Sequence, residues 1–178
     1  MATLWDREVS DDVKPGLEQL PPVARLELVL HVLEWTIEAL PASSRALLAE
    51  EAGKTVDSAT GWIRRSVAGE DVSDLPEDLV GELFEWRDDL RLVDLWQLFT
   101  ALNWCVGVPA AETTVDTAVE TISACYDVVR DCEDLPEFLE EVPEEKMFGA
   151  ERANANCMAA IAKQKEMVRE AVGRMPRR

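Results

Sequence analysis

The sequence predicts an all-α fold, a single-domain bundle of about seven helices. Apolar residues recur at three- and four-residue steps along most of the chain, which is the spacing of helices with a buried face. No segment alternates apolar and polar residues as a half-buried strand would, and no Asn-Gly or Asp-Gly hairpin signal occurs. A chain of 178 residues, 47% of them hydrophobic, is long enough to bury one substantial core. We therefore expect one helical domain over residues 1–178.

The expected helices follow one another through short connections. Residues 1–20 form an N-terminal helical segment that Pro15-Gly16 should interrupt. The remaining helices are expected over residues 21–40, 43–54, 56–69, 75–88, 90–106, 113–132 and 143–174. A short helix or turn beginning at Pro136 is expected over residues 135–142.

Local signals place the starts of the first helices. Pro21-Pro22 can begin a helix because proline is tolerated in a first helical turn. The apolar residues of this helix cover more than one stripe, so we expect it to lie centrally, with neighbours on several sides. Ser43 or Ser44 can cap the helix that follows.

The second half of the chain carries similar signals. Asp74 is expected to cap the helix over residues 75–88, with Pro76 and two acidic residues in its first turn. That helix should kink or break near Asp88-Asp89. Thr113 or Thr114 begins the next long helix, and Pro143 opens a basic C-terminal helix.

Negative charge is the most informative property of the chain. It has 36 Asp+Glu and 18 Lys+Arg, a formal net charge of −18. The last 28 residues hold seven basic and three acidic residues (+4), so residues 1–150 hold 11 basic and 33 acidic residues (−22). Such an excess repels itself in a compact state and attracts basic partners, whereas it repels nucleic acid. Two alternatives stay open: the acids form solvated helix faces, or the basic C-terminal helix pairs with the acidic body.

No segment predicts membrane insertion or export. The most apolar stretch, residues 92–108, is short and contains polar residues, so we expect a buried core helix and no membrane contact. The first ten residues lack the apolar run of a signal peptide. The four cysteines form no Cys-x-x-Cys pair, and we expect reduced, mostly buried thiols in a cytoplasmic protein.

Catalytic, cofactor and metal sites are not expected. The only histidine, His31, lies between Glu27 and Glu34, but a di-metal four-helix site needs a second histidine. Residues 131–136 are acidic but lack the glycine and the alternating ligands of a calcium loop. The chain has no Gly-rich phosphate loop, G-x-S-x-G or H-E-x-x-H motif. We expect a protein that is not an enzyme.

Two acidic blocks, residues 70–89 and 127–145, are the candidate partner-binding surfaces. On a helix, the acids at positions 74, 78, 82, 85 and 89 would share one face, where like charges repel by a few tenths of a kcal/mol per pair. Folding alone does not explain that repulsion, but a basic protein partner would. The candidate residues are Glu70, Asp71, Asp74, Glu77, Asp78, Glu82, Glu85, Trp86, Asp89, Glu133, Asp134, Glu137, Glu140 and Glu141.

Aromatic residues near the first block suggest how such a partner could be held. Trp62, Phe84 and Trp86 flank or interleave this block, and Trp86 is the candidate anchor, because interfaces draw most of their binding energy from a few aromatic residues rimmed by charge. The alternative is that this ring belongs to the core. A pocket lined by Trp35, Trp96 and Trp104 would instead indicate a small helical enzyme or a ligand carrier.

Residues 62–129 resemble small all-helical bacterial proteins, among them immunity proteins of polymorphic toxin systems. The resemblance lies in an acidic helix, the apolar helix over residues 92–104 and the segment Glu-Thr-Thr-Val-Asp-Thr-Ala-Val-Glu at 112–120. It implies a non-enzymatic protein that binds and blocks a cognate, basic toxin. It carries over no binding residues. A nucleic-acid mimic that inhibits a DNA-binding protein is the alternative binder.

Overall fold

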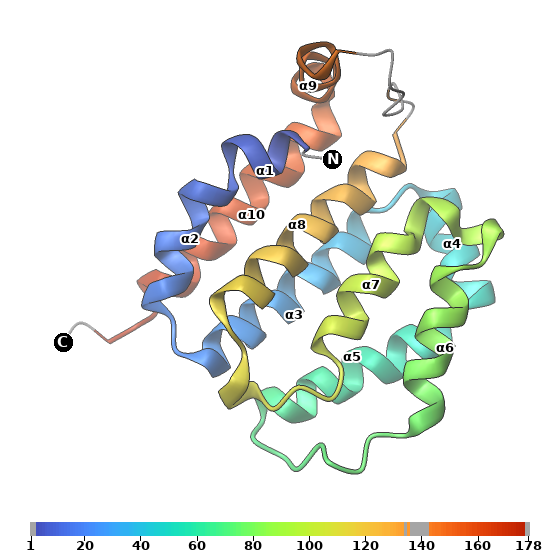
Figure 1. Cartoon of the computed structure of the whole chain (residues 1–178), viewed down its shortest axis with the longest axis vertical. Coiled ribbons are helices and arrows are strands. Elements are labelled where there is room, and N and C mark those ends of the chain that lie inside the picture. Colours follow the sequence, from blue (N-terminus) through green and yellow to red (C-terminus); the bar gives the residue numbers. More distant parts are fainter. Residues whose placement is uncertain (1–2, 134, 136–142, 177–178) are drawn as a thin grey trace.

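The computed structural model describes residues 3–133, 135 and 143–176 (Figure 1). Within these ranges the chain is all helical, without a strand, which confirms the predicted fold class. It has ten α-helices and two short 3-10 helices in the described residues, so the predicted number of about seven helices is too low. Their bounds are α1 (Leu4–Glu8), α2 (Ser10–Gln19), α3 (Pro22–Ala39), α4 (Ala42–Glu51), α5 (Gly53–Val67), α6 (Glu77–Arg87), η1 (Leu90–Leu95), α7 (Trp96–Cys105), η2 (Ala110–Glu112), α8 (Val115–Asp131), α9 (Glu144–Ala153) and α10 (Ala155–Gly173).

Helices α3 and α8 form the centre of the bundle. They pack against each other, with α1, α2 and α10 on one side and α7 followed by α6 on the other (Figure 1). Leu26 and Leu33 of α3 and Ile122 of α8 are among the fully buried side chains. Burial of one such side chain contributes roughly 2 kcal/mol. The predicted central position of the helix that begins at the double proline is confirmed.

The N-terminal segment breaks at a different residue from the one predicted. Pro15 lies inside α2, and the chain instead changes helix at Val9. Burial of Val13 and Leu17 on either side of Pro15 outweighs the hydrogen bond that proline removes. Gly16 is required here because a Cβ on it would lie 2.8 Å from Cγ1 of Val168, where α2 crosses α10.

The predicted C-terminal helix over residues 143–174 is wrong, because the structure divides it into α9 and α10. Asn154 has an extended backbone (φ −84°, ψ 122°) and caps α10: its side chain accepts hydrogen bonds from the backbone N–H groups of Asn156 and Cys157. Figure 1 shows α9 almost end-on, whereas α10 runs along α2. The change of direction at Asn154 lets α9 cross the end of the bundle.

The remaining helix boundaries agree with the predictions only in part. Thr114 caps α8 as predicted, accepting a hydrogen bond from the N–H of Thr117. Asp74 does not cap α6, which begins at Glu77 after Pro76; it pairs with Arg65 instead, at 3.5 Å. The predicted helices over 75–88 and 90–106 are separated by a break, followed by η1. The element predicted over residues 135–142 lies almost entirely outside the described residues.

No described helix is long and apolar enough to span a membrane.

Candidate functional site

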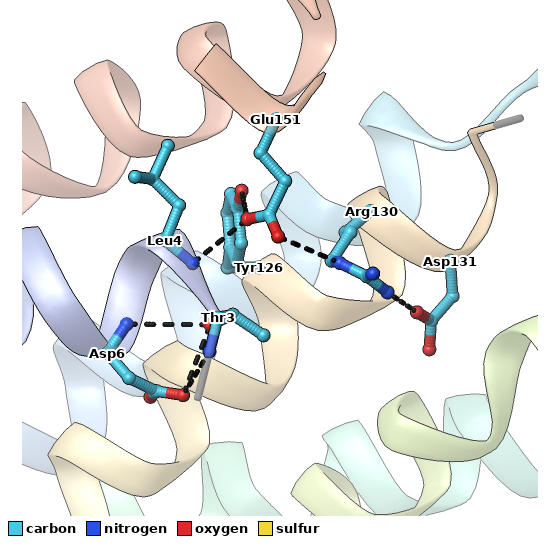
Figure 2. A network of polar contacts seen from close by, with 7 residues as sticks. All are labelled: Thr3, Leu4, Asp6, Tyr126, Arg130, Asp131 and Glu151. Carbon is cyan, nitrogen blue, oxygen red and sulfur yellow. Dashed lines mark hydrogen bonds and ion pairs between the residues drawn. The ribbon is translucent and has the colours of Figure 1, made fainter. Parts of the chain in front are cut away.

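The largest buried polar network surrounds Glu151 of α9 (Figure 2). Its carboxylate accepts hydrogen bonds from the backbone N–H of Leu4 (3.0 Å), the hydroxyl of Tyr126 (2.6 Å) and Nε of Arg130 (3.2 Å). Arg130 also contacts Asp131 at 3.0 Å. Because the network ties α1, α8 and α9 together and both Glu151 oxygens already accept hydrogen bonds, we assign it a structural role.

Asp127 lies beside this network on α8. Its Oδ1 is buried without a hydrogen-bond partner among the described residues. Burial, followed by the negative charges of Asp6, Asp131 and Glu151, raises its pKa to about 8, against the opposite influence of Arg130. Asp127 is therefore mostly protonated at neutral pH.

The cysteines and the histidine do not form a reactive or metal-binding group. All four cysteines are free, and burial raises the pKa of Cys105 to about 11 and that of Cys125 to about 12. Both thiols stay protonated at neutral pH, so they are poor nucleophiles and metal ligands. His31 is exposed on α3, beside a hollow of about 360 Å³ between α3 and α10. The described residues contain no group of three or more metal-ligating side chains.

The first acidic block divides into a loop and a helix. In the loop, Arg65 of α5 pairs with Glu70 at 3.0 Å and with Asp74 at 3.5 Å, and it donates to the backbone oxygen of Asp71. A hydrogen bond from the backbone of Ser73, with a smaller contribution from Arg65, lowers the pKa of Asp71. The loop acids are thus partly compensated by one arginine.

Helix α6 carries the uncompensated part of the block. Asp78 and Glu85 are exposed, and the described residues offer neither of them an ion-pair partner. Glu82 instead accepts a 2.7 Å hydrogen bond from Thr55. The predicted single face of five acids is wrong, because Asp74 and Asp89 lie outside α6. The side chain of Glu77 lies outside what the structure describes.

The acidic residues at the C-terminal end of the first block also form ion pairs with neighbouring arginines. Arg87 forms two hydrogen bonds with Asp88, and Arg91 pairs with Asp89 at 2.7 Å and with Glu51 at 2.6 Å. These contacts lower the pKa values of Asp88 and Asp89. Each positive charge in this region is held by a neighbouring carboxylate.

Trp86, the predicted anchor, is only partly exposed. It packs against the core, and its indole N–H donates to Oγ1 of Thr55 at 3.2 Å. Through Thr55 it is linked to Glu82. This chain of contacts joins α5 to α6, which supports the core interpretation of Trp86.

Four of the five candidate residues in the second acidic block lie outside the described residues. Asp134, Glu137, Glu140 and Glu141 belong to that part of the chain. Glu133 accepts hydrogen bonds from the side-chain amides of Asn154 (2.8 Å) and Asn156 (2.7 Å), which link the end of α8 to the start of α10. Its carboxylate therefore stabilises the fold.

The basic C-terminal residues do not pair with either block among the described residues. Arg152 contacts Glu8 of α1, and Lys165 contacts Asp12 of α2 at 2.7 Å. Within α10, Lys163 pairs with Glu166 and Arg174 with Glu170. The C-terminal cations thus pair with the acidic body through α1 and α2: Arg152 joins α9 to α1 and Lys165 joins α10 to α2, on the opposite side of α8 from α6 (Figure 1).

Four large apolar side chains lie exposed on η1 and α7. Leu90 is 86% exposed, Val93 54%, Trp96 41% and Trp104 37%. We call these four residues the α7 face. The buried core predicted over residues 92–108 is confirmed for Leu98, Phe99 and Leu102, but Val93, Trp96 and Trp104 of that stretch are exposed.

The suggested tryptophan pocket does not match this arrangement. Trp96 and Trp104 face solvent, and Trp35 is partly buried on α3. Four hollows at the surface of the described residues are lined by other side chains, none of them tryptophan.

Helix α8 carries a row of four acids along one face. Asp116, Glu120, Asp127 and Asp131 follow steps of four, seven and four residues, and each is at least partly exposed. Burial raises the pKa of Asp131, whereas Arg130 and the nearby Trp96 side chain lower it. We call these four residues the acidic row of α8. Asp127 and Asp131 belong to the second acidic block predicted from the sequence, whereas Asp116 and Glu120 lie outside both blocks.

No family model, no curated protein and no solved structure matches this chain. The resemblance to immunity proteins therefore stays a prediction.

Proposed function

We propose that this protein binds a basic protein partner and neutralises it, as an immunity protein neutralises a cognate toxin. We further propose that it is not an enzyme and that it acts in the cytoplasm, where its four free cysteines stay reduced.

One observation carries this proposal: Arg152, Lys163, Lys165 and Arg174 of the C-terminal region pair with carboxylates of α1, α2 and α10, and not with those of α6. Asp78 and Glu85 of α6 are exposed, and no cation among the described residues pairs with either carboxylate. Exposed charge of one sign mainly accelerates the encounter with an oppositely charged partner and excludes partners of like charge.

The association rate tests this role of α6. The protein captured from the native host by the wild-type chain is purified, and its binding is followed by stopped flow at low salt. The double variant Asp78→Lys/Glu85→Lys should associate at least about tenfold more slowly, because steering falls with the surface charge.

The matched control is Glu18→Lys/Glu27→Lys, which changes the net charge equally on the exposed surfaces of α2 and α3. It should retain most of the association rate. Equal slowing by both variants would contradict a specific acidic face. Neutralisation is tested by co-expression: the captured protein should inhibit growth alone and not together with this chain. Capture of a DNA-binding protein without toxicity would favour the nucleic-acid mimic.

A further inference from the structure

A hollow of about 340 Å³ lies where two connections between helices meet at one end of the bundle (Figure 1). The first connection, residues 68–76, joins α5 to α6, and the second, residues 106–114, joins α7 to α8. The beginning of α3 completes the wall with Val23. We call this hollow, lined by parts of both connections and by Val23, the loop hollow.

Five apolar side chains line the loop hollow. Val72 and Ala110 are buried, whereas Val23 is 42% exposed and no described element covers it. The other two are Pro109 and Ala111. Such a lining can cover the methylene groups of a long side chain, but it offers no partner for a charge.

Contacts between the two connections preform the loop hollow. Oγ of Ser66, at the end of α5, donates a 2.9 Å hydrogen bond to the backbone oxygen of Val108 in the second connection. Leu75 of the first connection lies against Gly107, where a Cβ would be only 2.7 Å from Cδ2 of Leu75. Gly107 also has a positive φ of 75°, which favours glycine. Because its walls are already held, the loop hollow needs little ordering when a ligand binds.

The charged side chains that line the loop hollow are both acidic, those of Glu70 and Asp71. Arg65 pairs with Glu70 and Asp74 from outside the lining, so three carboxylates of this connection share one arginine. The Asp71 carboxylate accepts a 2.9 Å hydrogen bond from the backbone N–H of Ser73. No cation in the described part of the chain forms an ion pair with it. The loop hollow therefore keeps a net negative charge beside an apolar lining.

The three other hollows at the surface of the described residues carry a different charge. Lys163 and Arg174 line the one between α3 and α10, and Lys165 and Arg169 line the one between α2 and α10. Arg25 lines the third, at the beginning of α3. Each of these hollows already contains a cation, so the loop hollow is the one of the four that suits a cationic ligand.

We propose that the loop hollow takes the side chain of an arginine from the basic partner. This inference rests on the proposed binding of a basic protein and specifies the contact by which that partner is held. The methylene groups of the arginine lie on the apolar lining, and its guanidinium reaches the carboxylates of Asp71 and Glu70. Arginine fits better than lysine because a planar guanidinium donates to two acceptors at once and is less strongly hydrated than an ammonium.

The cation n-butylguanidinium, which reproduces this side chain, provides a defined probe. Its titration into the wild-type chain, followed by ¹H–¹⁵N NMR, should give saturable shifts at Gly69, Val72 and Gly107. The neutral n-butylurea lacks the charge, and guanidinium lacks the methylene groups. Each should bind at least about fivefold more weakly, because each lacks one part of the complementarity. The probe n-butylammonium, which represents lysine, should also bind more weakly.

Variants of the loop hollow separate this site from general attraction to an acidic protein. Glu70→Gln/Asp71→Asn removes both charges but keeps the hydrogen-bond acceptors, and should weaken binding of n-butylguanidinium about tenfold. The matched control Asp78→Asn/Glu85→Gln removes equal charge from α6, outside the lining, and should bind as wild type. Ala111→Phe places a ring in the loop hollow from an exposed position, and should weaken binding of n-butylguanidinium and n-butylurea alike.

Three results would overturn the inference. They are binding of n-butylurea as tight as that of n-butylguanidinium, wild-type affinity in Glu70→Gln/Asp71→Asn, and shifts that do not saturate or that lie away from the two connections. Equal binding of n-butylammonium would overturn the preference for arginine.

Experiments with the captured partner distinguish failure of this inference from failure of the proposed function. Glu70→Gln/Asp71→Asn and Ala111→Phe should each raise the dissociation rate about tenfold, because contacts of this kind act mainly on dissociation. If dissociation is unchanged while the charge reversal on α6 slows association, the basic partner stands and its contact with the loop hollow does not. If no basic protein is captured, the proposed function fails, and saturable binding of n-butylguanidinium would still show that the loop hollow holds a guanidinium group.

Discussion

At the scale of single residues, the carboxyl group of Asp127 has the most unusual surroundings. It faces Asp6 of α1 and Glu151 of α9, and Asp131 lies one turn away on α8. Arg130 is the nearby positive charge that offsets these carboxylates, and it also pairs with Asp131 and Glu151. Protonation of Asp127 relieves a cluster of like charges at the point where α1 docks.

This placement predicts a pH-dependent stability. The pKa of Asp127 rises from 3.8 to about 8 on folding. Between these two pH values the folded chain therefore binds more protons than the unfolded chain. Its free energy of unfolding falls as the pH rises from about 4 to about 8. Asp127→Asn should be more stable than wild type at pH 9 by more than about 1 kcal/mol, and closer to wild type at pH 5. Urea denaturation at both pH values measures the difference.

The control is Asp57→Asn, which changes an exposed aspartate on α5. This variant should show the same difference in free energy of unfolding between pH 5 and pH 9 as the wild type. A wild-type pH dependence in Asp127→Asn would show that Asp127 is ionised throughout, with its charge balanced by Arg130.

At the scale of elements, helix starts were predictable where a backbone rule decides them. Pro22 begins α3 and Thr114 caps α8, as their residue types require. The break at Asn154 was not predictable from the apolar pattern, because that pattern continues across it. It depends on a side chain that caps α10 while also contacting Glu133 of α8, a tertiary contact.

The candidate site was likewise predictable from the sequence only in part. Asp78 and Glu85 are exposed as an acidic helix predicts, but Asp74 is not on their face because α6 begins only at Glu77, after Pro76. The α7 face was missed because periodicity marks apolar residues as core without regard to whether another element covers them. Coverage is set by the packing of α6 and α8 on either side of α7.

The cap at Asn154 yields a prediction for α10. Asn154→Ala removes two hydrogen bonds to the start of α10 and one to Glu133, and should lower the free energy of unfolding by about 1–2 kcal/mol. Asn156→Ala removes only a side-chain contact with Glu133 and serves as the control. Urea denaturation should show the larger loss for Asn154→Ala. Equal losses would mean that the link to Glu133, and not the cap, holds α10.

At the scale of the whole molecule, net charge opposes folding while local pairs moderate it. Ion pairs join α1 and α2 to α9 and α10, and Arg65, Arg87 and Arg91 offset neighbouring acids. Most of these pairs are exposed, and exposed pairs contribute at most about 1 kcal/mol each. The exposed carboxylates of α6 repel one another on the surface that we propose for a basic partner. A basic partner would relieve that repulsion, so binding and stability should be coupled.

Salt provides the test of this coupling in the absence of a partner. At an ionic strength of about 0.1 M the screening length is roughly 10 Å, so more salt weakens repulsion between separated carboxylates more than it weakens pairs in contact. The melting temperature should therefore rise as sodium chloride increases from low concentration to about 0.5 M, and potassium chloride should act equally. Asp78→Lys/Glu85→Lys removes repulsion between carboxylates of α6. Its melting temperature, measured by circular dichroism, should rise less with salt than that of wild type. A melting temperature that falls with salt would mean that attraction within ion pairs outweighs repulsion between the exposed carboxylates. A basic partner would then have no net repulsion to relieve.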